Sequence, residues 1–402
     1  MDLLYLSHCL PGAPDKGDKI RAYHQLHFLA ASHRVHLVCF ARSRAEAGGT
    51  RDLLRRCASV YVEPLRPAAA LVRAALRFAA GGCLTESFYA SGRMRRYVRE
   101  LARQTRLSAV LAYSTPMAQY APPGLPLLLD MCDVDSEKFR QYASMRPAGP
   151  LYTVEAARLR RLEVETAGRA RCTVLVTNPE RELLESLAGG ARVRCAPNGI
   201  DGEYFDPQRA GRLPELEGRR FLVFIGALDY YPNVEGVRWF AARVLPRLRW
   251  RDPSLEFWIV GRNPARAVRA LSKPEEGITV AANPVDVRPY LAASAAVAAP
   301  LHLARGIQNK VLEALAMGKR VFASTAICRT FGRDLPAGIV PCNSEGEFAD
   351  AVAREPLTAW ACDAAIRREA CEQFSWPRTL ALLEAELLGI RAKLPDGAAS
   401  ML

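Results

Sequence analysis

Residues 300–324 read PLHLARGIQNKVLEALAMGKRVFAS, and this stretch decides the predicted fold. An apolar run is followed by a polar turn that contains glycine, then by a segment with helical period and a second apolar run. This order predicts a strand, a loop, a helix and a second strand. Gly318 follows the predicted helix as its left-handed C′ residue. Apolar residues at helical spacing predict one buried stripe: Ile307, Val311, Leu312 and Leu315.

Polar residues of the same segment fall off the buried stripe. Lys310 and Glu313 are i, i+3 neighbours, and Asn309 and Glu313 are i, i+4, so the three side chains share one flank near the start of the helix. Free backbone N–H groups and the helix dipole attract anions at this end. Ligands of open α/β sheets also lie at the carboxyl ends of the strands. The sequence therefore predicts an anion-binding site here.

The stretch GIQNKVLEALAMGKRVFAS resembles the nucleotide-sugar-binding segment of family 4 retaining glycosyltransferases, which have the two-domain GT-B fold. In that family the segment carries two glutamates, of which the second holds the ribose hydroxyls of the nucleotide. Glu313 matches the second glutamate, although it is also placed to pair with Lys310. Arg305 stands where the first glutamate, which touches the donor sugar, is expected. The string ARGIQNKVLEA most resembles sugar transferases associated with bacterial PEP-CTERM/exosortase exopolysaccharide systems.

The resemblance covers nearly the whole chain and implies an α/β, GT-B architecture, with two Rossmann-like doubly wound domains facing across a cleft. The length of 402 residues suits two or three domains. No GxGxxG follows the first predicted strand, so a dinucleotide site is not expected. The predicted parts are an N-terminal acceptor domain (1–204), a C-terminal nucleotide-sugar or donor domain (205–373), and a C-terminal helix that crosses back to the N-terminal domain (374–392).

The resemblance also assigns donor-binding residues. Gly17 matches the glycine loop that faces the donor phosphate, although by spacing alone it is equally an ordinary turn glycine. After the turn at Gly226 the family commonly has an Arg and a Lys that hold the diphosphate, but here the chain reads DYYPN. Another cation has to serve, and the candidates are Arg262, Arg305 and Lys310. The predicted donor-binding set is Gly17, Gly226, Arg262, Arg305, Gly306, Ile307, Asn309, Lys310 and Glu313.

The catalytic candidates are Asp133, Arg305 and Lys310. Asp133 follows the predicted strand LPLLLDMC in a stretch that resembles the family's LDMVDVDSEK, which makes it a candidate for the acceptor site. Carboxylates at the end of a strand suit acceptor binding or chemistry, and metal coordination is a minor alternative. The resemblance implies metal-independent transfer, so we predict no metal site and no cofactor. Arg305 cannot accept hydrogen bonds, so it either replaces the missing diphosphate cation or binds an acidic sugar such as a uronic acid.

A formal net charge of +13 favours an anionic partner. Only 7 of the 55 basic residues are lysine, and such arginine enrichment also follows from a GC-rich coding sequence. Because no recognised motif accompanies the charge, we predict no nucleic-acid partner. Lys19 and Arg21 either meet an anion at the start of the first helix or are ordinary solvated cations. Lysines of the two loops assigned to the donor phosphates are Lys16, Lys19, Lys310 and Lys319.

Residues 68–80, AAALVRAALRFAA, predict a helix that has Arg73 and Arg77 on one face. Such a helix either lies on an anionic membrane surface or packs its opposite face, Leu71, Ala75 and Phe78, onto the core. The cysteines occur singly, without CxxC, which favours a reducing compartment. The first residues lack the basic region of a signal peptide, and no apolar stretch approaches the ~18 residues of a membrane span. We therefore predict a cytoplasmic protein, peripheral on the inner face of the plasma membrane.

The predicted function is transfer of a sugar from a nucleotide-diphosphate donor to a glycan or lipid-linked acceptor in exopolysaccharide synthesis. The rival is a non-catalytic nucleotide-sugar sensor or assembly partner with the same fold. Arg305 and the absent Arg/Lys pair favour the rival. The retained grouping of Asn309, Lys310 and Glu313 favours the enzyme.

Overall fold

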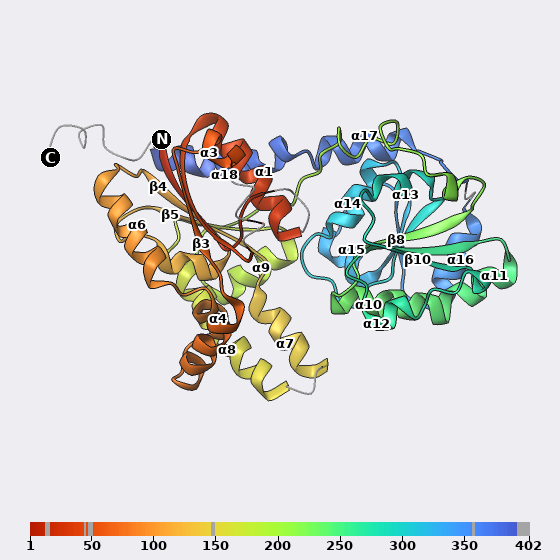
Figure 1. Cartoon of the computed structure of the whole chain (residues 1–402), viewed down its shortest axis with the longest axis horizontal. Helices are drawn as coiled ribbons and strands as arrows, with labels where there is room; N and C mark the ends of the chain where they lie inside the picture. The colour runs from red at the N-terminus through yellow and green to blue at the C-terminus, as the bar shows by residue number, and fades with distance from the viewer. Residues whose placement is uncertain (13–16, 44–45, 47–50, 146–148, 356–357, 392–402) are drawn as a thin grey trace. The chain divides into compact units, whose positions relative to one another are not determined.

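The structure is a computed structural model that describes residues 1–12, 17–43, 46, 51–145, 149–355 and 358–391 (Figure 1). The chain forms two compact units. The first comprises Met1–Pro197 and the C-terminal stretch from Thr379, and the second comprises Asn198–Arg378. The division after Pro197 comes earlier in the chain than the predicted domain boundary at residue 204.

The first unit is built on a seven-stranded parallel sheet in the order β3-β2-β1-β4-β5-β6-β7. A parallel sheet is covered on both faces, and accordingly the consecutive residues Leu3, Leu4 and Tyr5 are all fully buried. The strands are β1 (Asp2–Ser7), β2 (Arg34–Ala41), β3 (Ser59–Pro64), β4 (Ala109–Tyr113), β5 (Leu127–Cys132), β6 (Cys172–Leu175) and β7 (Val193–Cys195).

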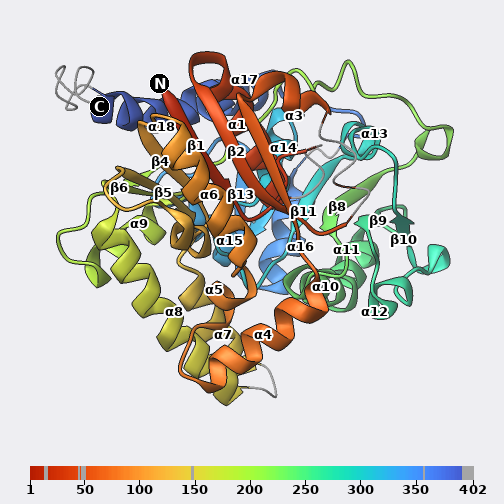
Figure 2. The ribbon, with the colours of Figure 1, turned by 60° about the vertical axis from the view of Figure 1, so that its left-hand side comes forward.

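Helices cover the faces of this sheet (Figure 2). One face packs against Met94 of α6 and Leu184 of α9. Ser91 and Thr177 cap these two helices, because each hydroxyl accepts a hydrogen bond from the backbone N–H three residues further on. The helices are α1 (Gly17–Ser32), α3 (Arg51–Arg56), α4 (Pro67–Ala79), α5 (Leu84–Phe88), α6 (Gly92–Gln104), α7 (Asp135–Met145), α8 (Gly149–Arg169), α9 (Asn178–Leu187) and α18 (Trp376–Arg391).

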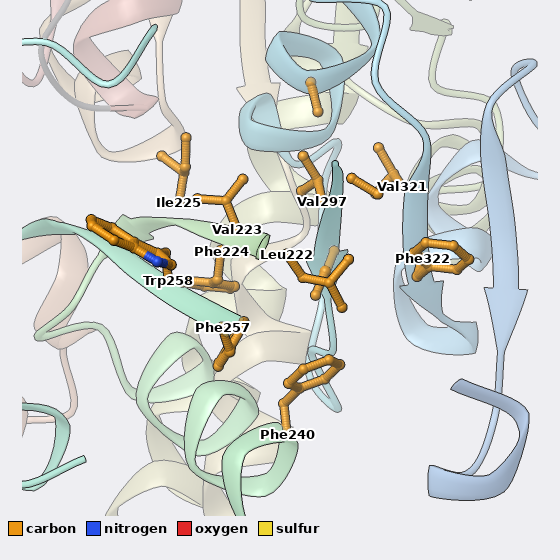
Figure 3. Close-up of a cluster of buried hydrophobic side chains, with 14 of the residues drawn as sticks. Leu222, Val223, Phe224, Ile225, Phe240, Phe257, Trp258, Val297, Val321 and Phe322 are labelled. Carbon is orange, nitrogen blue, oxygen red and sulfur yellow. The ribbon is translucent and has the colours of Figure 1, made fainter. Parts of the chain in front are cut away.

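The second unit has a six-stranded parallel sheet in the order β10-β9-β8-β11-β12-β13. Large side chains of its strands fill the core, among them Phe224, Phe257, Val297 and Phe322 (Figure 3). The strands are β8 (Phe221–Ala227), β9 (Glu256–Arg262), β10 (Ile278–Ala282), β11 (Ala296–Ala299), β12 (Val321–Ser324) and β13 (Ile339–Cys342). The helices are α10 (Tyr231–Trp239), α11 (Leu245–Arg251), α12 (Arg266–Arg269), α13 (Arg288–Ala293), α14 (Asn309–Ala316), α15 (Thr325–Phe331), α16 (Glu345–Arg354) and α17 (Ala364–Gln373).

Both units therefore have the α/β, Rossmann-like organisation that the sequence predicts. The segment from β11 through α14 to β12 also forms as expected. Val311, Leu312 and Leu315 are at most 1% exposed, and Gly318 has a φ of +67°. Ile307 is buried but precedes the first residue of α14, so it lies in the loop. Among the described residues, no helix is long and apolar enough to cross a membrane.

Arg21 does not have the role that the sequence suggested. We expected it to meet an anion at the start of α1, but it is 1% exposed and its Nε donates to Oδ2 of Asp130 at 2.7 Å. Gln25 donates to the same carboxylate oxygen, and Tyr5 donates to Gln25 at 2.9 Å. Burial lowers the pKa of Arg21, but the Asp130 carboxylate outweighs this effect, so the pKa is raised. The anion that Arg21 contacts is therefore the buried Asp130 carboxylate of the same unit and not a ligand.

Lys319 is also wrong as a donor-phosphate lysine. Its side chain is 1% exposed, and Nζ donates to three backbone carbonyls, those of Ala292, Ser294 and Ala361, at 2.8, 2.8 and 2.6 Å. Burial lowers the pKa of Lys319 to about 8. Its role is to join three segments of the second unit. Lys19 is likewise engaged, because its Nζ donates to Glu46 at 2.8 Å.

The buried Arg21–Asp130 pair provides a stability test of the first unit. Arg21→Leu should lower the free energy of unfolding by about 3–5 kcal/mol, because it leaves a buried carboxylate without its cation. The matched control is Arg34→Leu, whose exposed pair with Asp2 at 3.0 Å should contribute less than about 1 kcal/mol. Urea unfolding followed by circular dichroism measures both. Equal losses in the two variants would show that burial of the Arg21 pair is unimportant for stability.

Candidate functional site

The strand order of the second sheet reverses at β8. β9 and β10 lie on one side of it, and β11, β12 and β13 lie on the other. In open parallel sheets, ligands bind outside the carboxyl ends of the strands at such a reversal. The residues that end β8 and follow β11 include Gly226 and the run from Arg305 to Glu313. The topology therefore brings most of the predicted donor residues to one edge of the sheet.

Gly226 allows the side chain of Lys310 to reach the end of β8. A Cβ atom on Gly226 would lie 2.9 Å from Nδ2 of Asn233 and 3.1 Å from Nζ of Lys310. Lys310 Nζ donates to Oδ1 of Asn233 at 2.6 Å and lies 4.3 Å from the ring centroid of Phe224. Asn233 is 4% exposed, and its Nδ2 donates to the carbonyl of Ala227 at 2.8 Å. An amine is thus held beside the backbone at the end of β8.

Lys310 and Glu313 are half-buried neighbours on α14. Burial lowers the pKa of Lys310 to about 7, although the charge of Glu313 opposes this shift. Burial raises the pKa of Glu313 to about 7, against the charge of Lys310. Within the described part of the chain, no side-chain or backbone donor contacts the Glu313 carboxylate. Two ionisable groups that are perturbed in this way and lie at a strand-order reversal indicate a ligand site.

The start of α14 is fixed by contacts within the second unit. Asn198 Nδ2 donates to Oδ1 of Asn309 at 2.8 Å. Gly306 has a φ of +63°, a conformation that favours glycine. Ile307, next to it, packs in a small apolar cluster with Ile200, Leu312, Ala316 and Phe374. The side chains of Asn309 and Ile307 therefore hold the first turn of α14 in place, and any contact of Ile307 with a ligand would be through its backbone.

Two arginines stand at the same edge of the sheet. Arg262 is the last residue of β9, which pairs directly with β8, and its carbonyl accepts from the N–H of Leu228 at 2.8 Å. Arg305 lies in the loop before α14, where its carbonyl accepts from Nε2 of Gln308 at 3.1 Å. Both arginines are half-buried. The cationic candidates thus come from β9, from the loop after β11 and from α14.

The remaining predicted residues belong to the first unit. Gly17 begins α1, but residues 13–16 of its loop, including the proposed phosphate lysine at 16, lie outside the described residues. Asp133 directly follows β5, where Cys132 has a φ of +66°. Ser114, at the end of the neighbouring β4, has a φ of +75°. Strained backbone conformations of this kind concentrate at functional sites.

Sequence reasoning missed two residues of the site. Asn233 belongs to the DYYPN segment, which had drawn notice only for the cations that it lacks. The feature of the sequence that could have identified it is a polar residue in the first turn of the helix that follows the strand ending near Gly226. The second residue is Asn198. Its contact with Asn309, 111 residues further along the chain, had no local signal.

The arrangement offers one amine, one carboxylate and the free N–H groups of the first turn of α14. An amine and helix N–H groups bind phosphate oxygens, and a carboxylate accepts hydrogen bonds from hydroxyl groups. Among the described residues, no group of three or more His, Cys, Asp or Glu side chains could hold a metal ion. The chemistry fits a ligand that carries both phosphate and hydroxyl groups.

Comparison with known proteins bears on this site directly. Residues 219–354, which include β8 and α14, match the family described as glycosyl transferases group 1. A search of curated protein sequences gave no match.

Solved structures resemble the chain over nearly all of its length. The N-terminal domain of trehalose-6-phosphate phosphatase from Candida albicans has a TM-score of 0.67 at 11% identity, covering 97% of each chain. The α,α-trehalose 6-phosphate synthase of Burkholderia multivorans has a TM-score of 0.65 at 13% identity, covering 97% of this chain and 99% of its own. HepE of Anabaena, solved with UDP and glucose, has a TM-score of 0.64 at 14% identity, covering 97% of this chain and 100% of its own. The chain therefore has the GT-B fold, and its second unit is similar to the glycosyl transferases group 1 family over residues 219–354.

Proposed function

We propose that the protein is a retaining, metal-independent glycosyltransferase that takes a sugar from a nucleotide-diphosphate donor bound in its second unit. The observation that carries the proposal is the pair Lys310 and Glu313 at the strand-order reversal, with Lys310 held against Gly226 by Asn233. The group 1 match over residues 219–354 supports it. So does the similarity to HepE, which was solved with UDP and glucose.

Lys310 is the cation that holds the donor diphosphate in this proposal. The family that the sequence resembles commonly uses an Arg and a Lys after the glycine turn, and this chain has Asn233 in that segment. The Nζ of Lys310 reaches the same turn from α14, because Asn233 Oδ1 accepts from it at 2.6 Å. A nearby diphosphate would favour the charged form of Lys310, whose pKa burial lowers to about 7. The ligand would therefore supply the charge compensation that the free protein lacks.

Glu313 binds the ribose hydroxyls of the nucleotide in this proposal. It lies one helical turn beyond Lys310, on the flank that faces away from the buried residues Val311 and Leu315. Its carboxylate is half-buried and, among the described residues, accepts no hydrogen bond, so both oxygens are available to a diol. Lys310 and Glu313 would then bind adjacent parts of one ligand, its diphosphate and its ribose.

The chemical step depends on stabilising the departing nucleoside diphosphate. The N–H groups at the start of α14, together with Lys310, are preorganised for the negative charge that develops there. One such donor typically lowers the barrier by about 3 kcal/mol. A retaining transfer in which the acceptor attacks from the face of the leaving group needs no protein nucleophile. Arg305 either adds a second cation to the diphosphate or binds the carboxylate of an acidic donor sugar.

The acceptor is proposed to bind in the first unit, near Asp133. The backbone strain at Ser114 and Cys132 supports this edge of the sheet as a functional site. The resemblance to PEP-CTERM/exosortase-associated sugar transferases supports a lipid-linked glycan acceptor and a role in exopolysaccharide synthesis. Such an acceptor implies a cytoplasmic protein that works peripherally at the inner face of the plasma membrane.

Glu313→Ala should weaken the binding of UDP or GDP, whichever the protein prefers, by about tenfold or more. Each hydrogen bond to a charged group contributes roughly 1.5–3 kcal/mol, and 1.4 kcal/mol corresponds to a factor of ten. Isothermal titration calorimetry measures the affinity. The matched control is Glu235→Ala, an exposed glutamate of the same unit that pairs with Arg238 at 3.1 Å and should leave the affinity unchanged. An affinity of the Glu313 variant equal to wild type would remove the ribose assignment.

Lys310 should make nucleoside diphosphate binding depend on pH. Because its pKa in the free protein is lowered to about 7, raising the pH above 7 neutralises the amine, and binding then requires uptake of a proton. Between about pH 8 and 9, where the Glu313 carboxyl with its pKa of about 7 is already ionised, the affinity for UDP should therefore fall by up to about tenfold per pH unit, while that for uridine stays constant. Lys310→Arg keeps its charge and should abolish this pH dependence. If Arg305→Gln or Arg262→Gln abolishes it and Lys310→Arg does not, Lys310 is not the diphosphate cation.

Turnover separates the enzyme from a non-catalytic sensor. Purified protein incubated with UDP- or GDP-sugars and a bacterial membrane lipid extract should release free UDP or GDP, which a coupled luminescence assay detects. Lys310→Gln should lower the rate by about a hundredfold, the loss expected for one preorganised donor. A protein that binds the nucleotide sugar but releases no nucleoside diphosphate with any extract would be a sensor with the same fold.

A further inference from the structure

Helix α4 exposes its large apolar residues and buries its small ones. The residues that it buries against the first unit are Ala70 and Ala74. Leu71, Val72 and Leu76 face outward and are 62%, 62% and 69% exposed. The alternative in which Leu71, Ala75 and Phe78 pack onto the core is therefore wrong for Leu71 and Ala75, which are exposed, whereas Phe78 is half-buried. An amphipathic helix of a soluble domain normally has the reverse arrangement.

The exposed residues form one continuous surface. At the angular spacing of an α-helix they fall on a single arc opposite Ala70 and Ala74. Every member of the arc is apolar and exposed: Ala68, Leu71, Val72, Ala75, Leu76 and Ala79. We call this surface the α4 face. A contiguous exposed apolar surface on a folded domain marks an interaction site.

The orientation of α4 is fixed by polar contacts from beneath. Arg73 donates to the carbonyls of Ser87 and Phe88 at 3.2 and 3.0 Å, so it is turned toward α5. Arg158 of α8 donates to the carbonyl of Phe78 at 2.6 Å, and its guanidinium lies 4.3 Å from the Phe78 ring centroid. Arg73 thus ties α4 to α5, and Arg158 ties the last turn of α4 to α8. The α4 face is thus presented outward by a well-anchored helix.

Charge complementarity identifies the occupant of the α4 face. Residues 66–106 contain nine arginines and only two acidic residues, Glu86 and Glu100. Most of these arginines are exposed, at the two ends of α4 and along α6: Arg66, Arg77, Arg93, Arg95, Arg96, Arg99 and Arg103. An apolar strip on a basic part of the unit matches an anionic lipid surface, where apolar side chains enter the acyl boundary and cations meet phosphates. A stable interface with protein needs about 20–30 residues on each side, more than this single short helix provides.

We propose that α4 inserts Leu71, Val72 and Leu76 into the interface of an anionic lipid bilayer, whose phosphates attract the exposed arginines of residues 66–106. This inference rests on the peripheral location proposed above and names the surface responsible for it. It differs from the sequence-based expectation in its physical basis, because insertion of apolar side chains persists in salt and attraction of surface charges does not.

Vesicle flotation tests the proposal. Wild-type protein should float with vesicles of phosphatidylcholine and phosphatidylglycerol, and part of this binding should remain in high salt. The double variant Leu71→Ser/Leu76→Ser should bind the vesicles at least about tenfold more weakly than wild type, and Val72→Ser should also weaken the binding, by a smaller factor. The matched control is Leu54→Ser on α3, a leucine of the same unit that is 59% exposed and should bind like wild type. UDP affinity of all variants should equal that of wild type.

Failure of the lipid-insertion proposal and failure of the proposed function would give different results. Wild-type-like flotation of the double variant, or complete loss of wild-type binding in salt, would overturn insertion by α4. A wild-type dimer that the double variant converts to a monomer, measured by light scattering, would also overturn it by assigning the α4 face to a second copy of the chain. Absence of both UDP and GDP binding in the wild type with flotation as expected would instead remove the proposed function and leave the lipid surface in place.

Discussion

The amine of Lys310 can stand at the end of β8 only because residue 226 has no side chain. Gly226 pairs with Gly261 across the sheet, and a Cβ atom on Gly261 would lie 1.8 Å from the carbonyl oxygen of Gly226. Two glycines therefore open the carboxyl edge of β8 and β9. α14 fills the space beside it, with Val311 and Leu315 anchored in the core. The packing of Val311 and Leu315 positions the backbone of Lys310, and the hydrogen bond to Asn233 positions its amine.

Three cationic side chains of this chain have different partners, and the partners indicate which of them has a structural role and which could bind a ligand. Arg21 has a full counter-charge in Asp130, so it is held as part of the core of the first unit. Lys319 has three carbonyl oxygens and no carboxylate, a neutral cage that joins segments but offers nothing to a ligand. Lys310 has a single amide oxygen and an aromatic face. Burial lowers the pKa of both lysines, but only Lys310 of these three cations stands half-buried at the carboxyl edge of the sheet, where an anionic ligand can compensate its charge.

Two surfaces of the first unit to which we assign a function have unfavourable local features, either a strained backbone or exposed apolar side chains. Ser114 and Cys132 adopt positive φ values at the ends of two neighbouring strands, where extended backbone would cost less. α4 exposes leucine and buries alanine, against the usual preference of a soluble domain. A sequence optimised for folding alone would show neither feature. One is at the edge of the sheet where the acceptor is proposed to bind, and the other is a surface whose apolar residues suit lipid.

The sequence by itself determined the strand, helix and strand around residues 300–324 and the grouping of Asn309, Lys310 and Glu313, because each depends on short-range periodicity and on turn residues. The two Rossmann-like halves were predicted from the resemblance to a known family. Only the tertiary structure decided which cations are available. Arg21 and Lys310 are both cations at neutral pH as far as the sequence shows, but one meets Asp130, 109 residues away, and the other meets Asn233, 77 residues away. Helical period likewise located α4, but could not decide whether its leucines face the core or solvent. That choice depends on which neighbours the fold supplies, and no local pattern encodes contacts between segments so far apart in the chain.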